Sequence, residues 1–316
     1  MTTALIIGHG QIGAEIAAQL SEAGIETRIA TRSAKAALVD AWPVETGTVE
    51  GPPTPLHVRA DATDRNQLRR AAEGSDVIFA CAHAAYDSRV WERILPALDA
   101  AVLDTAAELG IPVVFPESVY GFVGLEGPLT ESSPFAPSED KGRIRQRLIE
   151  ARRSHPARAA SVIAGDLIGT TAEPNSSVVR LCITERVKNH QLPFAPARTK
   201  VPHGITVIAD LAAAMIRTGE LLQNDAAGTH RLVIAPTSNP TLDEIAAFTA
   251  SEVGTKPRKI LALPHWVTRA SGLFDRSMYE IAALRELWYR PNIVEPGEIA
   301  EELGTTPWQQ GARQML

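Results

Sequence analysis

The sequence predicts an α/β fold, a doubly wound parallel sheet followed by a smaller, mainly helical lobe. Strand-like and helix-like segments alternate through the first half with short connections, which is the pattern of a parallel sheet. The strand-like segments are continuous apolar runs, as expected where helices cover both faces of a sheet. A glycine-rich turn, "GHGQIG", joins the first strand to the first helix.

The first half of the chain supplies six strands and the helices between them. The first strand, "TALIIG" at 3–8, leads into a helix whose apolar residues recur at helical spacing up to Leu20. Thr63 is the expected N-cap of a helix that runs to Gly74. The other strands are expected at 27–31, 56–61, 76–82, 112–115 and 159–164, with further helices at 89–109 and along the basic segment "KGRIRQRL".

The rhythm of strand and helix changes after about residue 167, which divides the chain into a sheet domain, 1–166, and a substrate lobe, 167–316. Within the second region, helices are expected at 209–222 and 241–253, and "RLVIA" at 231–235 is strand-like. Some segments of the lobe are therefore expected to return to the main sheet.

Composition and charge exclude several classes of protein. Of the 316 residues, 45% are hydrophobic and 22% charged, as in ordinary soluble globular proteins. The net charge of −6 argues against nucleic acid or an anionic membrane as partner. No run reaches the roughly 18–20 apolar residues that span a bilayer.

Cysteine and histidine usage narrows the classes further. Cys81 and Cys182, the two cysteines, fit a reducing cytosol. The eight histidines show no metal-ligand spacing, so no metal is expected. We expect a cytoplasmic protein that acts on a small molecule, with a homodimer as the default assembly.

Gly8, Gly10 and Gly13 follow the first strand in the spacing G-x-G-x-x-G and open the first helix. In that context the motif is typical of a dinucleotide-binding (Rossmann) domain. Gly8 permits the tight turn, Gly10 lets pyrophosphate approach the backbone, and Gly13 lets the helix pack closely on the strand. Phosphates would meet the N–H groups at the start of this helix, so Gln11 and Ile12 join the predicted cofactor site.

The end of the second strand indicates which nucleotide binds. An acidic residue there selects NAD, whereas an arginine accommodates the 2′-phosphate of NADP. The chain reads "ATRSAK", in which Arg32 is suited to the phosphate and adenine and Ser33 can donate a hydrogen bond. The sequence therefore favours NADP(H) and leaves NAD(H) open.

The chain resembles the short-chain dehydrogenase/reductase superfamily, on its extended and atypical branch related to NAD-dependent epimerase/dehydratases. The resemblance covers nearly the whole length. It rests on the glycine loop, "RADATD" (59–64), "DVIFACA" (76–82), "VVFPESVYG" (113–121), "GPLTESSPFAP" (127–137) and two C-terminal segments, 203–216 and 239–254.

The resemblance implies roles by position. Asp61 and Ala62 would contact the adenine, while Ala80, Cys81 and Ala82 would line the cofactor. In such enzymes a Ser or Thr after the fifth strand binds the substrate oxygen, and the tyrosine of a Tyr-x-x-x-Lys pair transfers the proton. The lysine of that pair holds the nicotinamide ribose and lowers the pKa of the tyrosine.

This chain departs from that pattern at the active-site helix. Counting from Pro137, the positions of the tyrosine and lysine hold Lys141 and Arg145, while the glycine between them, Gly142, is kept. At about 100° per residue, both cations fall on the arc of the apolar residues, so we expect both to face the cofactor cleft. An ammonium at 141 can stabilise a developing alkoxide, and Arg145 can do so as a fixed cation.

Other residues near this helix are candidates for the proton chemistry. Ser118 is the nearest counterpart of the family serine, although Glu117 competes for that place, and Tyr120 is the nearest phenol. The predicted catalytic set is therefore Lys141, Ser118 and Tyr120. His83 and Tyr86 follow the fourth strand and are expected at the rim of the cleft, with Asp166 as a weaker candidate.

The expected function is NADP(H)-dependent reduction of a carbonyl group on a small organic molecule, with aromatic compounds among the candidates. Two alternatives stay open: a non-catalytic NADP-binding redox sensor, and a nucleotide-sugar epimerase or dehydratase. A nucleotide-sugar enzyme needs basic groups in the second lobe to bind a diphosphate, and basic residues are scattered through that lobe. Aromatic residues between 265 and 289 are expected mainly to pack the lobe, with a pocket for an aromatic substrate as the second interpretation: Trp266, Phe274, Tyr279, Trp288 and Tyr289.

Overall fold

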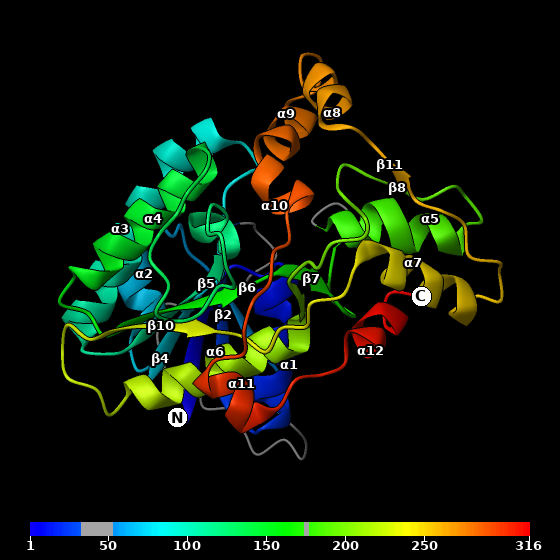
Figure 1. Cartoon of the computed structure of the whole chain (residues 1–316). Coiled ribbons are helices and arrows are strands. Elements are labelled where there is room, and N and C mark those ends of the chain that lie inside the picture. The colour runs from blue at the N-terminus through cyan, green and yellow to red at the C-terminus, as the bar shows by residue number, and fades with distance from the viewer. Residues whose placement is uncertain (33–52, 174–176) are drawn as a thin grey trace.

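The computed structural model describes residues 1–32, 53–173 and 177–316, and its centre is a parallel sheet. Seven strands follow the order β10-β6-β5-β4-β1-β2-β3, and all neighbouring pairs are parallel (Figure 1). The predicted doubly wound sheet is therefore confirmed. The strands are β1 (Thr3–Ile7), β2 (Glu26–Thr31), β3 (Leu56–Arg59), β4 (Val77–Ala80), β5 (Val113–Ser118), β6 (Ala159–Ala164) and β10 (His230–Ile234).

Helices cover both faces of this sheet, and the side chains of β1 alternate between them. Leu5 and Ile7 pack with residues of three helices on one face, whereas Ala4 and Ile6 pack with three on the other. Burial of each Leu or Ile stabilises the fold by roughly 1.5–3 kcal/mol. The first face carries α2 (Arg65–Ala72), α3 (Ser88–Leu109) and α4 (Asp140–Arg153), and the second carries α1 (Gln11–Glu22), α6 (Ile208–Leu222) and α11 (Glu298–Leu303) (Figure 1).

Residues beyond 167 contribute both to this sheet and to a smaller lobe. Helix α6 packs beside α1, and β10 is the edge strand next to β6. Short strand pairs and helices make up the lobe. They are β7 (Asp166–Ile168) with β9 (Ile205–Val207), β8 (Phe194–Ala195) with β11 (Leu261–Ala262), and α5 (Glu185–Lys188), α7 (Leu242–Glu252), α8 (His265–Ser271), α9 (Arg276–Ala283), α10 (Arg285–Tyr289) and α12 (Trp308–Arg313).

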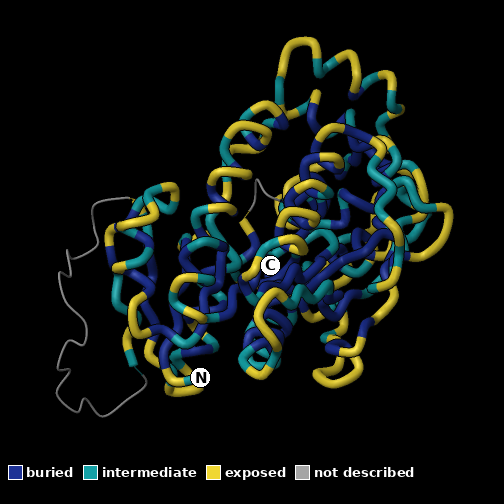
Figure 2. Tube along the Cα trace, turned by 90° about the vertical axis from the view of Figure 1, so that its left-hand side faces the viewer, coloured by how far each residue is buried: buried dark blue, intermediate teal, exposed yellow. Residues whose placement is uncertain are grey.

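The aromatic residues of the lobe do not all pack as expected. Trp288 is buried, but Trp266, Phe274 and Tyr279 are 71%, 93% and 46% exposed. Helices α8 and α9 pack mainly on each other and stand out at the top of Figures 1 and 2, where exposed segments dominate. The prediction that these three rings fill the lobe is wrong, because spacing along a helix does not say whether another element covers it.

Ser33, one of the predicted cofactor-binding residues, lies outside the described residues. Within the described ranges, no helix combines the length and apolar character needed to cross a bilayer.

The start of α2 corrects one predicted helix boundary. Its N-cap is Asp64 rather than Thr63, and the Asp64 carboxylate accepts hydrogen bonds from two first-turn N–H groups at 2.9 and 3.1 Å. The Thr63 hydroxyl instead donates to Asp61 at 2.8 Å. A carboxylate both accepts these bonds and meets the positive end of the helix dipole, which favours the aspartate.

This cap can be tested by comparing two alanine variants. Asp64→Ala should lower the free energy of unfolding by about 1 kcal/mol, because two first-turn N–H groups lose their acceptor. Thr63→Ala, the matched control, should cost less than half as much. Urea denaturation measures both, and equal losses would show that Asp64 is not the cap.

Candidate active site

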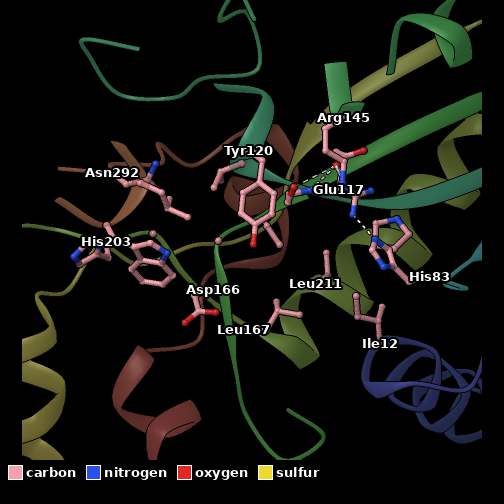
Figure 3. Close-up of a pocket in the computed structure, with 18 residues that line it drawn as sticks. Ile12, His83, Glu117, Tyr120, Arg145, Asp166, Leu167, His203, Leu211 and Asn292 are labelled. Carbon is pink, nitrogen blue, oxygen red and sulfur yellow. Dashed lines mark hydrogen bonds and ion pairs between the residues drawn. The ribbon is translucent and has the colours of Figure 1, made fainter. Parts of the chain in front are cut away.

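Two adjoining cavities lie at the carboxyl ends of the central strands. Their volumes are about 710 and 180 Å³. Both are lined by Ile12, Ser118, Arg145 and Trp288, so they form one cleft between the sheet domain and the lobe. Figure 3 shows the residues that line the smaller cavity. Ligands of open α/β folds bind at this edge of the sheet.

The glycine loop brings β1, α1 and the end of β4 into close contact. Gly8 has a φ of +95°, and a Cβ there would lie 2.7 Å from the backbone nitrogen of Ala82. A Cβ on Gly13 would lie 2.2 Å from the carbonyl oxygen of Gly8. Neither position accepts a larger side chain without movement of the backbone.

Gly10 leaves open space in front of α1. It is the N-cap of that helix, so no side chain caps the first-turn N–H groups. Nothing lies within 4 Å of where its Cβ would be. The first turn of α1 contains no acidic residue. Because Gly10, Gln11 and Ile12 line the larger cavity, this helix start fits a dinucleotide pyrophosphate.

Three residues at the end of β4 line the same cavity: Ala80, Cys81 and Ala82. Burial raises the pKa of the Cys81 thiol to about 12. The thiol therefore stays protonated and serves as a small apolar surface rather than a nucleophile.

The residues expected around the adenosine lie beyond the two cavities. Arg32 is exposed at the end of β2, and Asp61 and Ala62 follow β3, its neighbour in the sheet. Hydrogen bonds from Thr63, and to a smaller extent the charge of Arg32, hold the pKa of Asp61 below its usual value. An arginine and an ionised acid thus occupy neighbouring strand ends on this side.

The carboxylate of Glu117 joins two arginine side chains beneath the cleft, and Figure 3 shows it beside one of them, Arg145. One oxygen lies 3.2 Å from Nε of Arg145 and accepts the N–H of Ser118 at 2.8 Å. The other accepts Nη1 of Arg152 at 2.9 Å, and Arg152 also pairs with Asp99 at 2.6 Å. All four charged side chains are buried, so this network ties α3, β5 and α4 together.

Arg145 also contacts His83 at the rim of the cleft. Burial, and then the charge of Arg145, lowers the pKa of His83 to about 4. The imidazole is therefore neutral. Its Nδ1 donates to the carbonyl of Ala84 at 2.8 Å, which leaves Nε2 to accept from the guanidinium.

Lys141 lies elsewhere than expected. Its ammonium is fully buried, 3.1 Å from a carboxylate oxygen of Glu280 on α9 and 3.0 Å from the carbonyl oxygen of the same residue. It stands 3.9 Å from the ring centroid of Tyr86 and lines neither cavity. Of the two cations at the positions of the family tyrosine and lysine, Arg145 thus faces the cleft and Lys141 faces the lobe.

Tyr120 lies in a 3-10 turn, Val119–Phe122, directly after β5. Its hydroxyl is 3.2 Å from that of Tyr86, and its ring stacks on Trp91. Burial raises the pKa of Tyr120 to about 12, so the phenol is protonated near neutrality. Ser118 and Tyr120 line both cavities.

Asp166 begins β7 and lines both cavities. Burial raises its pKa to about 6, although it accepts hydrogen bonds from the backbone of Val179 and the hydroxyl of Ser177. It is therefore a group of the cleft that changes charge close to neutral pH.

The lobe closes the cleft with residues that the sequence analysis did not single out as site residues. His203 and Asn292 line the smaller cavity (Figure 3), and the centroids of the His203 and Trp288 rings are 5.7 Å apart. The side-chain oxygen of Asn292 is buried without a hydrogen-bond partner within the described part of the chain. His203 begins the segment 203–216 that carries part of the family resemblance, but that resemblance gave it no role, and Asn292 stands in no motif. Separate segments of the chain bring the two side chains to the same cavity.

The basic residues of the lobe lie away from both cavities. Arg180 pairs with Glu185 at 3.1 Å, and Arg186 donates to the carbonyl of Leu192 at 2.7 Å. Among the described residues that line the cleft, the permanent cations are Arg145 and Arg152, and both are held by carboxylates.

The raised pKa of Asp166 predicts a pH-dependent stability. Because the fold binds this proton more tightly than the unfolded chain, the stabilisation is complete below about pH 4 and is lost as the pH rises to about 6. Relative to Asp166→Asn, the free energy of unfolding should fall by on the order of 2 kcal/mol across that range. Denaturation at several pH values measures it.

The matched control is Asp140→Asn, the same change at an exposed position on α4. The free energy of unfolding of Asp140→Asn should change with pH in the same way as that of the wild type. If the free energies of unfolding of the wild type and Asp166→Asn differ by a constant amount from pH 4 to about 7, the pKa of Asp166 is not raised.

Solved structures with the same fold include several that hold a nucleotide sugar or are named for one. MoeE5 in complex with UDP-glucose and NAD matches with a TM-score of 0.71 and 15% identity, over 99% of this chain and 97% of that one. A double mutant of the dTDP-glucose 4,6-dehydratase DesIV from Streptomyces venezuelae, with NAD and DAU bound, matches at 0.70 and 16%, over 99% and 96%. UDP-N-acetylglucosamine 4-epimerase from Bacillus cereus matches at 0.70 and 11%, over 100% and 98%.

At these identities the likeness is one of fold. No curated protein matches the sequence. The model of one family, described as the NAD dependent epimerase/dehydratase family, matches residues 4–230, which include the glycine loop and the altered helix. The resemblance drawn from the sequence motifs is thereby confirmed, and the chain belongs to the NAD dependent epimerase/dehydratase family.

Proposed function

We propose that this protein transfers hydride between a nicotinamide dinucleotide and the carbonyl or alcohol carbon of a small molecule, with net carbonyl reduction as the main activity. The observation that carries the proposal is the continuous cleft. It runs from Gly10 and Ile12, at the start of α1, to Ser118, Tyr120 and Asp166. The dinucleotide would supply the hydride, and the chain would bind the substrate and move the proton.

Arg32 supports NADP(H) as the cofactor, because a guanidinium at the end of β2 suits a 2′-phosphate. The related structures contain NAD, which makes NAD(H) the alternative. Binding measurements with both nucleotides decide between them.

Ser118 and Tyr120 are the proposed donors to the substrate oxygen. Both line the cleft, and the phenol of Tyr120, with a pKa of about 12, carries its proton at neutral pH. A donor in this state can protonate an alkoxide as it forms. Lys141 was the first candidate from the sequence, but its ammonium is held by Glu280, so we propose an electrostatic role for it instead.

The charges of the cleft favour a compact substrate without a diphosphate. A diphosphate needs cations that are not already paired with carboxylates, and Arg145 and Arg152 are both paired with Glu117. Apolar lining from Ile281 and Trp288 suits an aromatic or aliphatic carbonyl compound.

Nucleotide-sugar epimerisation or dehydration is the second candidate. The observation in its favour is the similarity to MoeE5, DesIV and the Bacillus cereus epimerase. Hydride transfer to and from a bound dinucleotide is common to both proposals, so the two differ in substrate and in net redox change.

Purified protein tests these proposals directly. NADPH should bind more tightly than NADH, and a panel of ketones that includes polycyclic aromatic ones should contain compounds that cause NADPH oxidation, followed by absorbance. UDP-glucose and dTDP-glucose serve as the comparison, with sugar products detected by chromatography. Turnover of a sugar without net NADPH consumption would favour the second candidate, and binding of NADPH without any turnover would favour a sensor.

The glycine loop offers a matched pair of variants for the cofactor site. Gly10→Ala should keep the fold, at a cost below about 1 kcal/mol, yet weaken NADPH binding at least about tenfold, because the methyl group enters the space proposed for pyrophosphate. Gly13→Ala should instead lower the stability by about 1–3 kcal/mol through its clash with the Gly8 carbonyl. Calorimetry and thermal denaturation separate the two effects, and unchanged binding by Gly10→Ala would contradict the site.

A further inference from the structure

Three groups from separate parts of the chain meet beside the cleft. Tyr86 comes from the loop between β4 and α3, Tyr120 from the turn after β5, and Lys141 from the first turn of α4. The two phenol oxygens are 3.2 Å apart, and the ammonium is 3.9 Å from the centre of the Tyr86 ring. Both tyrosines line the larger cavity.

We propose that Tyr86 is a proton-relay residue that resupplies Tyr120, with Lys141 as its electrostatic support. This inference rests on the proposed hydride transfer and adds the source of the proton. In the related enzymes a tyrosine and a lysine on one helix form the phenol–ammonium pair. Here the same two chemical groups are joined from two elements, with the ammonium on α4 and the phenol on the β4–α3 loop.

The position of the two hydroxyl groups suits a relay. Tyr120 lines both cavities and reaches the part of the cleft beside Ser118, whereas Tyr86 lines only the larger cavity and is 40% exposed. A proton can therefore pass from water to Tyr86, then to Tyr120, then to the substrate. Tyr120 is only partly exposed, so Tyr86 is the phenol of the pair that lies nearer to bulk water.

The charges around Tyr86 oppose one another. Burial raises the pKa of Tyr86 well above its usual value, and Tyr120, Glu139 and Glu280 add to the rise. The group is thus a phenol at neutral pH and can donate. The Lys141 ammonium faces its ring, where a cation stabilises the aromatic π-system and limits the cost of the phenolate that forms in transit.

The atoms balance through one turnover. The hydride adds to the carbonyl carbon of the substrate, and the electron pair of the C=O bond moves to the oxygen. The O–H bond of Tyr120 breaks as the product O–H bond forms, and the Tyr86 proton then passes to Tyr120. Tyr86 regains its proton through water from a solvent acid, so each turnover consumes one proton. A bound dinucleotide would supply the hydride and be oxidised by two electrons.

Spectroscopy tests the phenol pair without any substrate. The chain has four tyrosines, so labelling at the ring carbon that bears the hydroxyl gives few NMR signals, each assignable by a Tyr→Phe variant. In the full-length protein, Tyr86→Phe should shift the Tyr120 signal, because the hydroxyl partner is lost. Tyr279→Phe, on the exposed face of α9, should leave it unchanged.

The role of Lys141 has its own comparison. Lys141→Met would leave the Glu280 carboxylate without its partner, so the double variant Lys141→Met/Glu280→Gln removes both charges together. The titration midpoint of Tyr86 should rise in the single variant, and by less in the double variant. A midpoint that does not move in either, with a Tyr120 signal unaffected by Tyr86→Phe, would overturn the proposal.

Activity provides the second arm, with phenanthrenequinone and NADPH as the probe. Tyr86→Phe should lower kcat at least about tenfold while KM stays within about twofold, and should enlarge the solvent isotope effect. Tyr279→Phe should match the wild type. If the wild type reduces this probe and Tyr86→Phe does so at the same rate and with the same pH profile, the relay is wrong and the proposed function stands.

If the wild type reduces no carbonyl compound, the proposed function fails. The NMR comparison then still decides whether the two phenols are coupled and supported by Lys141.

Discussion

The cleft depends on one buried carboxylate, that of Glu117, which lies between Arg145 and Arg152. Two guanidinium groups so close together repel each other in a medium of low dielectric constant, and a buried ion that loses its partner destabilises a fold by about 3–5 kcal/mol. Glu117, near the end of β5, supplies the negative charge that both arginines pair with. The same carboxylate accepts the N–H of Ser118, so the residue that neutralises the charges also fixes the backbone that brings Ser118 and Tyr120 to the cleft.

Lys141 and Arg145, which stand where the family has Tyr-x-x-x-Lys, pair with different carboxylates. Arg145 keeps its charge at any ordinary pH and has several donors, so it can pair with Glu117 and still contact His83. Lys141 pairs with Glu280, whose other oxygen accepts the N–H and hydroxyl of Ser88 at 2.9 and 3.0 Å. One helix thus shapes the cleft with one cation and holds α9 of the lobe with the other.

Local sequence predicted what local physics determines. The strands could be predicted because strands that are buried on both faces need continuous apolar runs. The glycine loop could be predicted because the backbone contacts at Gly8 and Gly13 leave no room for a larger side chain. The direction of Lys141 could not be found, since helical spacing gives the face of α4 but not the element that covers it. Glu280 lies 139 positions further along the chain, and no pattern links the two. For the same reason, the position of Asn292 in the site could not be predicted from the sequence.

The fold and the family specify the chemistry more closely than they specify the substrate. A dinucleotide beside a substrate carbon is compatible with reduction, epimerisation and dehydration alike, and the likeness to nucleotide-sugar enzymes is one of backbone. The substrate must instead satisfy the charges that the cleft presents. Since Arg145 and Arg152 are already neutralised, and Asp166 gains a negative charge only above about pH 6, a second large anion would enter a cleft with no spare cation among its described lining residues. A neutral carbonyl compound meets no such cost, because Trp288 and Ile281 offer it an apolar surface and Ser118 and Tyr120 offer it hydrogen bonds.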